Sequence, residues 1–246
     1  MVKYLLENLI DGKIPSKCTE LHCSKNELNE LPELPQTLQI LNCSKNKLNE
    51  LPELPQTLQK LDCGNNNLSN LPKLPQTLIE LYCHKNNLSS LPELPQTLIM
   101  FCCYYNIINE LPELPQILEE LYCDENNLNS LPKLSNSLKR LDCSSNNLSE
   151  LPKLPQTLIE LYCNENNLSL LPELPETLKN LQCKHNKLNE LPELPETLIN
   201  LGCYNNNIKY LSSNNCYIIK KLRWVNLSNN PFSEQFTDIQ VFYASF

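Results

Sequence analysis

Residues 31–50 read LPELPQTLQILNCSKNKLNE, and residues 51–70 repeat the pattern as LPELPQTLQKLDCGNNNLSN. The period of 20 residues continues without a slip through ten cysteines, from Cys23 to Cys203, and asparagine stands three positions after each of them. A fixed period of this length predicts a solenoid, in which each repeat adds one coil and neighbouring coils bury a shared core.

The middle of each repeat predicts a short β-strand. Side chains alternate along this stretch, so Leu41 and Cys43 point inward while Ile40, Asn42 and Ser44 point outward. Strands repeated in one direction stack as a parallel sheet with a spacing of about 4.8 Å. We expect the asparagine after each cysteine to bond to the backbone of neighbouring loops. The interior is then filled by the leucines of the repeat, such as Leu48, Leu51, Leu54, Leu58 and Leu61.

Two prolines three positions apart, such as Pro52 and Pro55, shape the rest of the repeat. They exclude a helix interior and favour extended or polyproline II backbone. The segment L-x-x-L-x-C-x-x-N-x-L, at residues 38–48, matches the leucine-rich repeat consensus. The predicted fold is therefore a leucine-rich repeat solenoid of about eleven repeats, with a parallel β-sheet on its concave face and extended return legs.

The pattern changes at both ends of the chain. The first coil starts near Ile14, and we expect residues 1–13 to cap it as a short amphipathic helix that uses Tyr4, Leu5 and Ile10. Leu227 takes the place of the cysteine in the last strand, which makes eleven strands, and it follows Cys203 by 24 residues. This division predicts a cap at 1–13, a solenoid at 14–233 and a capping tail at 234–246.

The 20-residue unit resembles the bacterial-type leucine-rich repeats of pathogen effectors, the YopM-like and IpaH-like proteins, and similar repeats occur in giant-virus proteins. The resemblance covers residues 14 to about 211 and implies a binding scaffold, directed at a host protein if the chain is an effector. IpaH-like effectors also carry a C-terminal ubiquitin-ligase domain. We expect none here, because the residues after Phe232 are too few for one.

Composition and charge narrow the classes of partner. The net charge is -8, and glutamates of the return legs outnumber the lysines there, so we expect no nucleic acid partner. No run approaches the roughly 20 apolar residues of a membrane-spanning helix, and the N-terminus lacks a secretory pattern. We therefore expect no membrane partner and a cytoplasmic protein, in the cytosol or nucleus of a host if it is an effector.

The thirteen cysteines invite readings as disulfides, a metal site or a catalytic thiol. No C-x-x-C pair suggests zinc, and neighbouring strands hold parallel side chains too far apart for disulfides. We expect ten inward thiols that act as small buried hydrophobic groups, and Cys102 to be exposed at an outward position. Cys102, His84 and Asp124 fall on adjacent strands without a positioned base or an oxyanion hole. The prediction is no enzyme and no cofactor.

Outward strand positions of the central repeats carry large aromatic residues, whereas the end repeats carry mostly Asn, Ser, Gln and Gly. Exposed tyrosines are typical of interaction sites, because they bring much contact area with few rotamers to freeze. The chain is predicted to bind a partner protein on its concave face. The alternative is an expanded repeat protein with a passive structural role and no dedicated partner. The candidate contact residues are Tyr82, His84, Tyr104, Tyr122, Asp124 and Tyr162.

Overall fold

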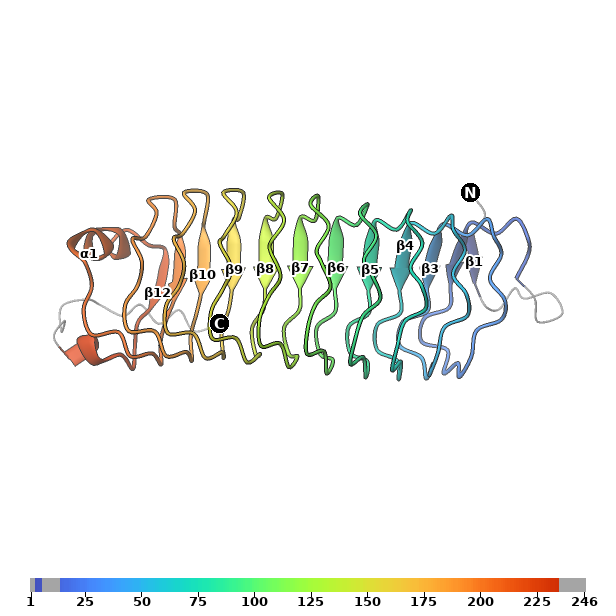
Figure 1. The fold of residues 1–246 in the computed structure, drawn as a ribbon, viewed down its shortest axis with the longest axis horizontal. Coiled ribbons are helices and arrows are strands. Elements are labelled where there is room, and N and C mark those ends of the chain that lie inside the picture. Colours follow the sequence, from blue (N-terminus) through green and yellow to red (C-terminus); the bar gives the residue numbers. More distant parts are fainter. Residues whose placement is uncertain (1–2, 6–13, 235–246) are drawn as a thin grey trace. The chain divides into compact units, whose positions relative to one another are not determined.

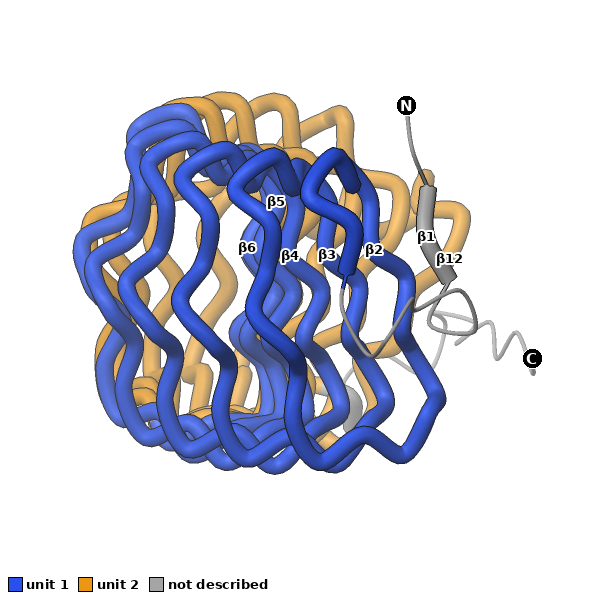
Figure 2. Tube along the Cα trace, turned by 90° about the vertical axis from the view of Figure 1, so that its right-hand side faces the viewer, with its two compact units in different colours: residues 1–127 blue, residues 128–246 orange. Residues whose placement is uncertain are grey.

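The computed structural model describes residues 3–5 and 14–234, and it divides the chain into two compact units, residues 1–127 and 128–246. Figure 2 colours the two units separately. Each unit consists of stacked coils, and successive strands start 20 residues apart from β2 to β11. The predicted leucine-rich repeat solenoid with a parallel sheet is confirmed.

Unit 1 contains seven strands, which pair in parallel and in chain order (Figure 1). The inward residues are in register, so that Leu21, Leu41 and Leu61 lie opposite one another. The strands are β1 (Lys3–Leu5), β2 (Glu20–His22), β3 (Ile40–Asn42), β4 (Lys60–Asp62), β5 (Glu80–Tyr82), β6 (Met100–Cys102) and β7 (Glu120–Tyr122).

The described part of unit 2 consists of coils of the same kind, with five strands and one short α-helix. Pairing is again parallel, from β8 with β9 to β11 with β12. Strands β2 to β12 are the eleven that the repeat predicts. The elements of unit 2 are β8 (Arg140–Asp142), β9 (Glu160–Tyr162), β10 (Asn180–Gln182), β11 (Asn200–Gly202), α1 (Ser213–Ile219), β12 (Trp224–Asn226) and the 3-10 turn η2 (Pro231–Glu234).

The core is a set of leucine columns that run along each unit. In the repeat around β4, Leu58, Leu61 and Leu68 are fully buried, and Cys63 lies beside them with no exposed surface. Burial of one leucine side chain contributes about 1.5 to 3 kcal/mol, and every coil repeats the set. The ten cysteines of the repeat are all buried, and none of them forms a disulfide, as the sequence predicts.

Within each unit, a ladder of asparagine side chains joins neighbouring coils. The Asn66 amide donates to the carbonyls of Cys43 and Cys63 at 3.1 and 3.0 Å, and its oxygen accepts from Leu48 N at 3.0 Å. One side chain thus satisfies backbone groups of two coils that are out of reach of water. The prediction that this asparagine bonds to neighbouring loops is confirmed.

The return legs contain no helix within the described repeats, and each ends in a turn such as that at Gln56 and Thr57. The Thr57 hydroxyl lies 2.8 Å from the carbonyl oxygen of Gln36 and 2.7 Å from that of Leu38. This hydroxyl is therefore shared between two acceptors of the preceding coil. The same threonine contact recurs along both units and fixes the spacing of the legs.

The prediction of an N-terminal helix is wrong over residues 3–5, because these residues form strand β1 in register with β2. A strand here supplies backbone partners to the open edge of β2, and an isolated helix of that length would be marginal. Residues 6–13 lie outside the described chain, as do residues 235–246 of the expected capping tail.

Helix α1 is a feature that the sequence did not predict. It replaces the return leg in the coil between Cys203 and Leu227, where the proline pair is missing and four residues are added. Ser212 caps it by accepting from Asn215 N at 3.1 Å. Asn215 in turn accepts from Leu194 N at 2.9 Å, which docks the helix on the preceding coil.

Candidate partner-binding face

Five of the six candidate residues lie in unit 1, on the face that carries the strands β5, β6 and β7. We call this the strand-bearing face. Tyr82 and Tyr122 close β5 and β7, and they lie on either side of Cys102 in the register. His84, Tyr104 and Asp124 follow two positions after the strands. All five are half-buried, so the fold holds part of each side chain and leaves the rest open to solvent: Tyr82, His84, Tyr104, Tyr122 and Asp124.

Tyr82 is held in place by charged and polar neighbours. Its hydroxyl donates to Glu80 at 2.9 Å and lies 2.7 Å from the Met100 sulfur. Lys60 forms an ion pair with the same Glu80 at 2.7 Å, and its ammonium lies 5.2 Å from the centre of the Tyr82 ring. Burial and then the Glu80 carboxylate raise the pKa of Tyr82, so the phenol stays neutral. The ring is thus fixed before any partner arrives.

His84 lies between two coils in a narrow slot. Its ring stacks on Tyr104, with centroids 4.6 Å apart and planes 12° apart. On the other side is Gly64, where even a Cβ atom would come within 2.6 Å of His84 Nε2. Burial is the main cause that lowers the pKa of His84, so the imidazole is neutral at neutral pH. Its Nδ1 atom is buried and has no hydrogen-bond partner among the described residues.

Tyr122 and Asp124 form the far side of the group. The Tyr122 hydroxyl donates to Glu120 at 2.8 Å, and Asp124 accepts through its carbonyl from Tyr105 N at 3.0 Å. Tyr122 thus ends β7, and Asp124 lies in the loop that follows β7. The structure brings all five candidates of unit 1 onto three neighbouring coils.

The sixth candidate, Tyr162, belongs to a polar chain in unit 2. Its hydroxyl donates to Glu160 at 3.1 Å and accepts from Asn180 at 2.8 Å. Arg140 binds the same Glu160 through two hydrogen bonds of 3.0 Å. Each neighbour of Tyr162 therefore comes from β8, β9 or β10, and the residue is held as firmly as its counterparts in unit 1.

The expected exposure of Cys102 is wrong, because only 6% of its surface is accessible. The short Cys102 side chain lies between Tyr82 and Tyr122 in the register of the sheet, and both of these side chains are much larger. Burial, reinforced by nearby carboxylates, raises the pKa of Cys102 to about 12. The described residues show no hydrogen bond between this thiol and His84. A protonated thiol without a base lacks what a nucleophile needs.

Exposed apolar side chains beside this face were not predicted from the sequence. Tyr105 is 56% exposed and Ile107 is 51% exposed, and both lie in the loop after β6. Alternation within the strand could not reveal them, because the exposure of Tyr105 follows from its positive φ of 58°. Other exposed apolar residues of unit 1 are Ile79, Ile99 and Ile117.

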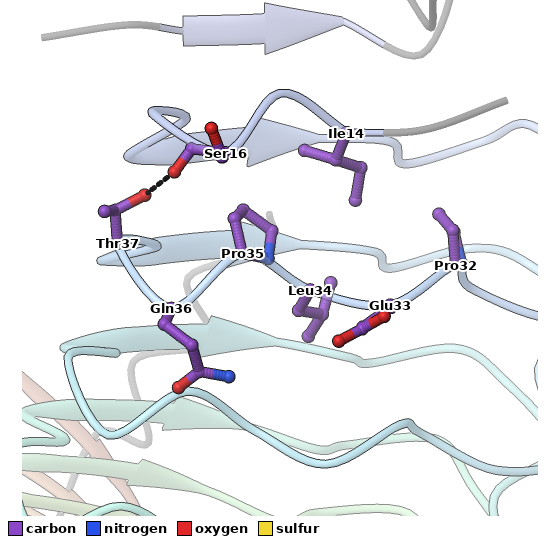
Figure 3. Close-up of a pocket in the computed structure, with 8 residues that line it drawn as sticks. All are labelled: Ile14, Ser16, Pro32, Glu33, Leu34, Pro35, Gln36 and Thr37. Carbon is purple, nitrogen blue, oxygen red and sulfur yellow. Dashed lines mark hydrogen bonds between the residues drawn. The ribbon is translucent and has the colours of Figure 1, made fainter. Parts of the chain in front are cut away.

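A separate hollow of about 600 Å³ lies at the return legs of the first two coils. Figure 3 shows its lining, where the Thr37 hydroxyl donates to the Ser16 carbonyl at 2.9 Å. None of the candidate residues reaches it. The lining residues are Ile14, Ser16, Pro32, Glu33, Leu34, Pro35, Gln36 and Thr37.

Among the described residues, no group of three or more His, Cys, Asp or Glu side chains is placed to hold a metal ion. Across the same residues, no helix has the length and apolar character that crossing a membrane requires.

Parallel strands 20 residues apart, a leucine interior and an asparagine ladder define a leucine-rich repeat protein. No protein-family model matches the chain, and no curated protein matches it. Among solved structures it is similar to YopM from Yersinia enterocolitica WA-314, with 34% identity and a TM-score of 0.79 over 89% of this chain and 52% of that one.

Two further structures share the repeat. YopM from Yersinia pestis, a leucine-rich effector protein, is 30% identical with a TM-score of 0.58, over 90% of this chain and 80% of that chain. A Shigella effector LRR domain is 35% identical with a TM-score of 0.55, over 62% and 69% of the two chains. The chain belongs to the bacterial-type, YopM-like leucine-rich repeat family, and it spans 52% of the Y. enterocolitica protein.

Proposed function

We propose that the chain is a non-catalytic scaffold that recognises a partner protein on the strand-bearing face of unit 1, the face expected to be concave. The observation that carries this proposal is the state of Tyr82, Tyr104 and Tyr122. Each is partly open to solvent, and each is already fixed by a hydrogen bond or a ring stack. Such residues lose little freedom on binding, which is how aromatic hot spots gain affinity.

A role without catalysis is supported by the chemistry of the cysteines. Burial raises the pKa of repeat thiols such as Cys63 and Cys183, and it raises the pKa of Cys203 to about 12. Those thiols stay protonated at neutral pH and are shielded from substrates. The proposal includes no cofactor and no nucleic acid or membrane partner.

The relatives support a role directed at a host protein, because YopM from Y. pestis is described as an effector. We place the chain in the host cytosol or nucleus on this basis. A passive repeat without a partner is the competing proposal, and it predicts that the tyrosines of unit 1 are replaceable without consequence.

The experiment uses substitutions that the repeat itself supplies. Asn42 and Ser44 occupy the positions equivalent to those of the three tyrosines, so Tyr82→Asn, Tyr104→Ser and Tyr122→Asn are compatible with the backbone. Wild type and this triple variant are used as bait in host lysate, and captured proteins are identified by mass spectrometry. We expect the variant to unfold cooperatively and to lose the captured partner.

The controls separate the two units. Tyr204→Ser changes the position of unit 2 that is equivalent to Tyr104, and it should leave capture intact. Tyr162→Asn tests the sixth candidate and should weaken capture if the partner also reaches unit 2. Undiminished capture by the triple variant would place the binding site away from the strand-bearing face of unit 1.

A further inference from the structure

The loops that follow the strands of unit 1 carry a row of side chains in register, which we call the loop row. Each of its residues has a positive φ, between 51° and 62°, and the first five donate their backbone N–H to the neighbouring coil, as Lys85 does to Tyr104 O at 2.9 Å. The left-handed backbone turns these side chains outward. In order along the unit, the loop row is Lys25, Lys45, Asn65, Lys85, Tyr105 and Glu125.

Three of the first four residues of the loop row are lysines. Lys25, Lys45 and Lys85 are exposed, and no described carboxylate lies within ion-pair distance of them. Lys85 instead lies 5.8 Å from the ring centre of Tyr105. The chain has a net charge of -8, so this basic row runs against its overall charge. Exposed charges of one sign attract and orient a partner of the opposite sign.

An apolar surface follows the lysines. Tyr105 and Ile107 are more than half exposed. Tyr105 lies beside Lys85, and Ile107 follows in the same loop, where its N–H donates to Leu88 O at 3.0 Å. In the other coils of unit 1 the position of Ile107 is held by polar residues, including Asn67 and Asn87. Tyr105 of the loop row and Ile107 beside it are thus two large exposed apolar side chains among polar loop residues. Such a pair is typical of a docking point and does not belong to the core.

We propose that the loop row of unit 1 binds an acidic protein segment that carries a large apolar side chain. The apolar side chain packs on Tyr105 and Ile107, and carboxylates of the same segment lie over Lys85 and Lys45. The inference extends the proposed function, because it names the chemistry of a protein partner, but it uses residues outside the strand-bearing face.

A nucleic acid strand fits this surface less well. Stacking on Tyr105 would be available to a base, but aliphatic Ile107 offers a base no hydrogen bond and Glu125 closes the loop row with a charge that repels phosphate. Three lysines also neutralise few phosphates, and such binding would be weak at physiological salt.

The test selects peptides from a phage-displayed random library on the full chain at low salt. Enriched peptides are synthesised, and their Kd is measured by fluorescence anisotropy. We expect negatively charged sequences with a Trp, Phe or Leu, and weaker binding as salt increases. Enrichment of basic peptides, or no enrichment at all, overturns the inference, as does tighter binding of single-stranded DNA than of any peptide.

Variants are again taken from the repeat. Lys45→Glu with Lys85→Glu is compatible with the backbone, since Glu125 has the same left-handed conformation, and it should weaken peptide binding about tenfold or more. Tyr105→Asn with Ile107→Asn should abolish it. The asparagine at position 105 should not lower the melting temperature, because asparagine tolerates positive φ. Lys187→Glu with Lys209→Glu, in unit 2, is the matched charge control.

The two proposals fail in different ways. If the triple tyrosine variant no longer binds the selected peptides but both loop-row variants still bind them, this inference is refuted and the proposed function stands. If only the loop-row variants lose binding, the inference is supported, and the peptides do not bind on the strand-bearing face.

Discussion

The imidazole of His84 stacks face to face on the phenol of Tyr104, with ring centroids 4.6 Å apart. The two residues stand on neighbouring coils at equivalent positions of the repeat. Aromatic pairs of this geometry contribute about 0.5 to 1.5 kcal/mol beyond their buried area. The stack therefore orients two residues of the candidate face at the same time.

Gly64→Ala should displace this stack. A Cβ at position 64 would lie 2.6 Å from His84 Nε2 and 2.7 Å from Nδ1, so the ring must swing toward solvent. The main cause that lowers the pKa of His84 is burial. We expect its pKa to increase toward the ordinary value of 6.5 in the variant. Titration of the His84 ring by NMR measures the change directly.

The same pKa shift sets a dependence of stability on pH. The folded protein binds a proton on His84 less readily than the unfolded chain does, so stability is complete above pH 6.5 and decreases as pH decreases below it. Replacing His84 with the serine found at Ser24 and Ser44 should remove this contribution. Equal loss of stability between pH 7 and pH 5 in wild type and His84→Ser would contradict the interpretation.

Native thiol reactivity should be confined to Cys216. Twelve of the thirteen cysteines are buried, and only Cys216 is half exposed. Alkylation for a few minutes at pH 8 should modify that residue alone, whereas denaturant should release all thirteen thiols. Peptide mapping by mass spectrometry locates the label. Fast labelling of Cys102 would show that Tyr82 and Tyr122 do not cover it.

Strands β2 to β12 and the asparagine ladder could be predicted from the sequence because they follow from the period and the alternation of apolar positions. Strand β1 and helix α1 lie where the period breaks, so no neighbouring repeat indicated them. The burial of Cys102 depends on the size of its cross-strand neighbours, and the exposure of Tyr105 depends on a left-handed φ. Cross-strand neighbours differ from coil to coil, and the left-handed φ recurs at one repeat position without any glycine to mark it, so the sequence pattern indicated neither exposure.

Asn86→Ala tests the asparagine ladder. Asn86 accepts from Leu68 N at 3.0 Å and donates to the carbonyls of Cys63 and Cys83, both at 3.1 Å. Alanine leaves the buried Leu68 N–H without a partner, and it removes one of the two asparagine donors that the Cys63 carbonyl and the Cys83 carbonyl each have. This loss should cost about 1 to 3 kcal/mol. Urea unfolding of each variant measures the loss. The exposed neighbour Asn87→Ala is the control and should change stability by less than about 0.5 kcal/mol.

Ile117→Thr should stabilise the protein, because it restores a contact that one coil of unit 1 lacks. Threonine at the equivalent position 97 shares its hydroxyl between the carbonyls of Gln76 and Leu78, at 2.9 and 2.7 Å. Ile117 has no hydroxyl to offer to the carbonyls of the coil before it, and 47% of its surface is exposed, so its removal sacrifices little burial. We expect a gain of about 0.5 to 1.5 kcal/mol in urea unfolding.

The reciprocal change supplies the control for this prediction. Thr97→Val keeps the shape of the side chain, removes the hydroxyl and should destabilise by a similar amount. The two changes in one chain should nearly cancel, because they act on the same kind of contact one coil apart. If Thr97→Val destabilises while Ile117→Thr brings no gain, then the legs at residue 117 are spaced by something other than the threonine hydroxyl.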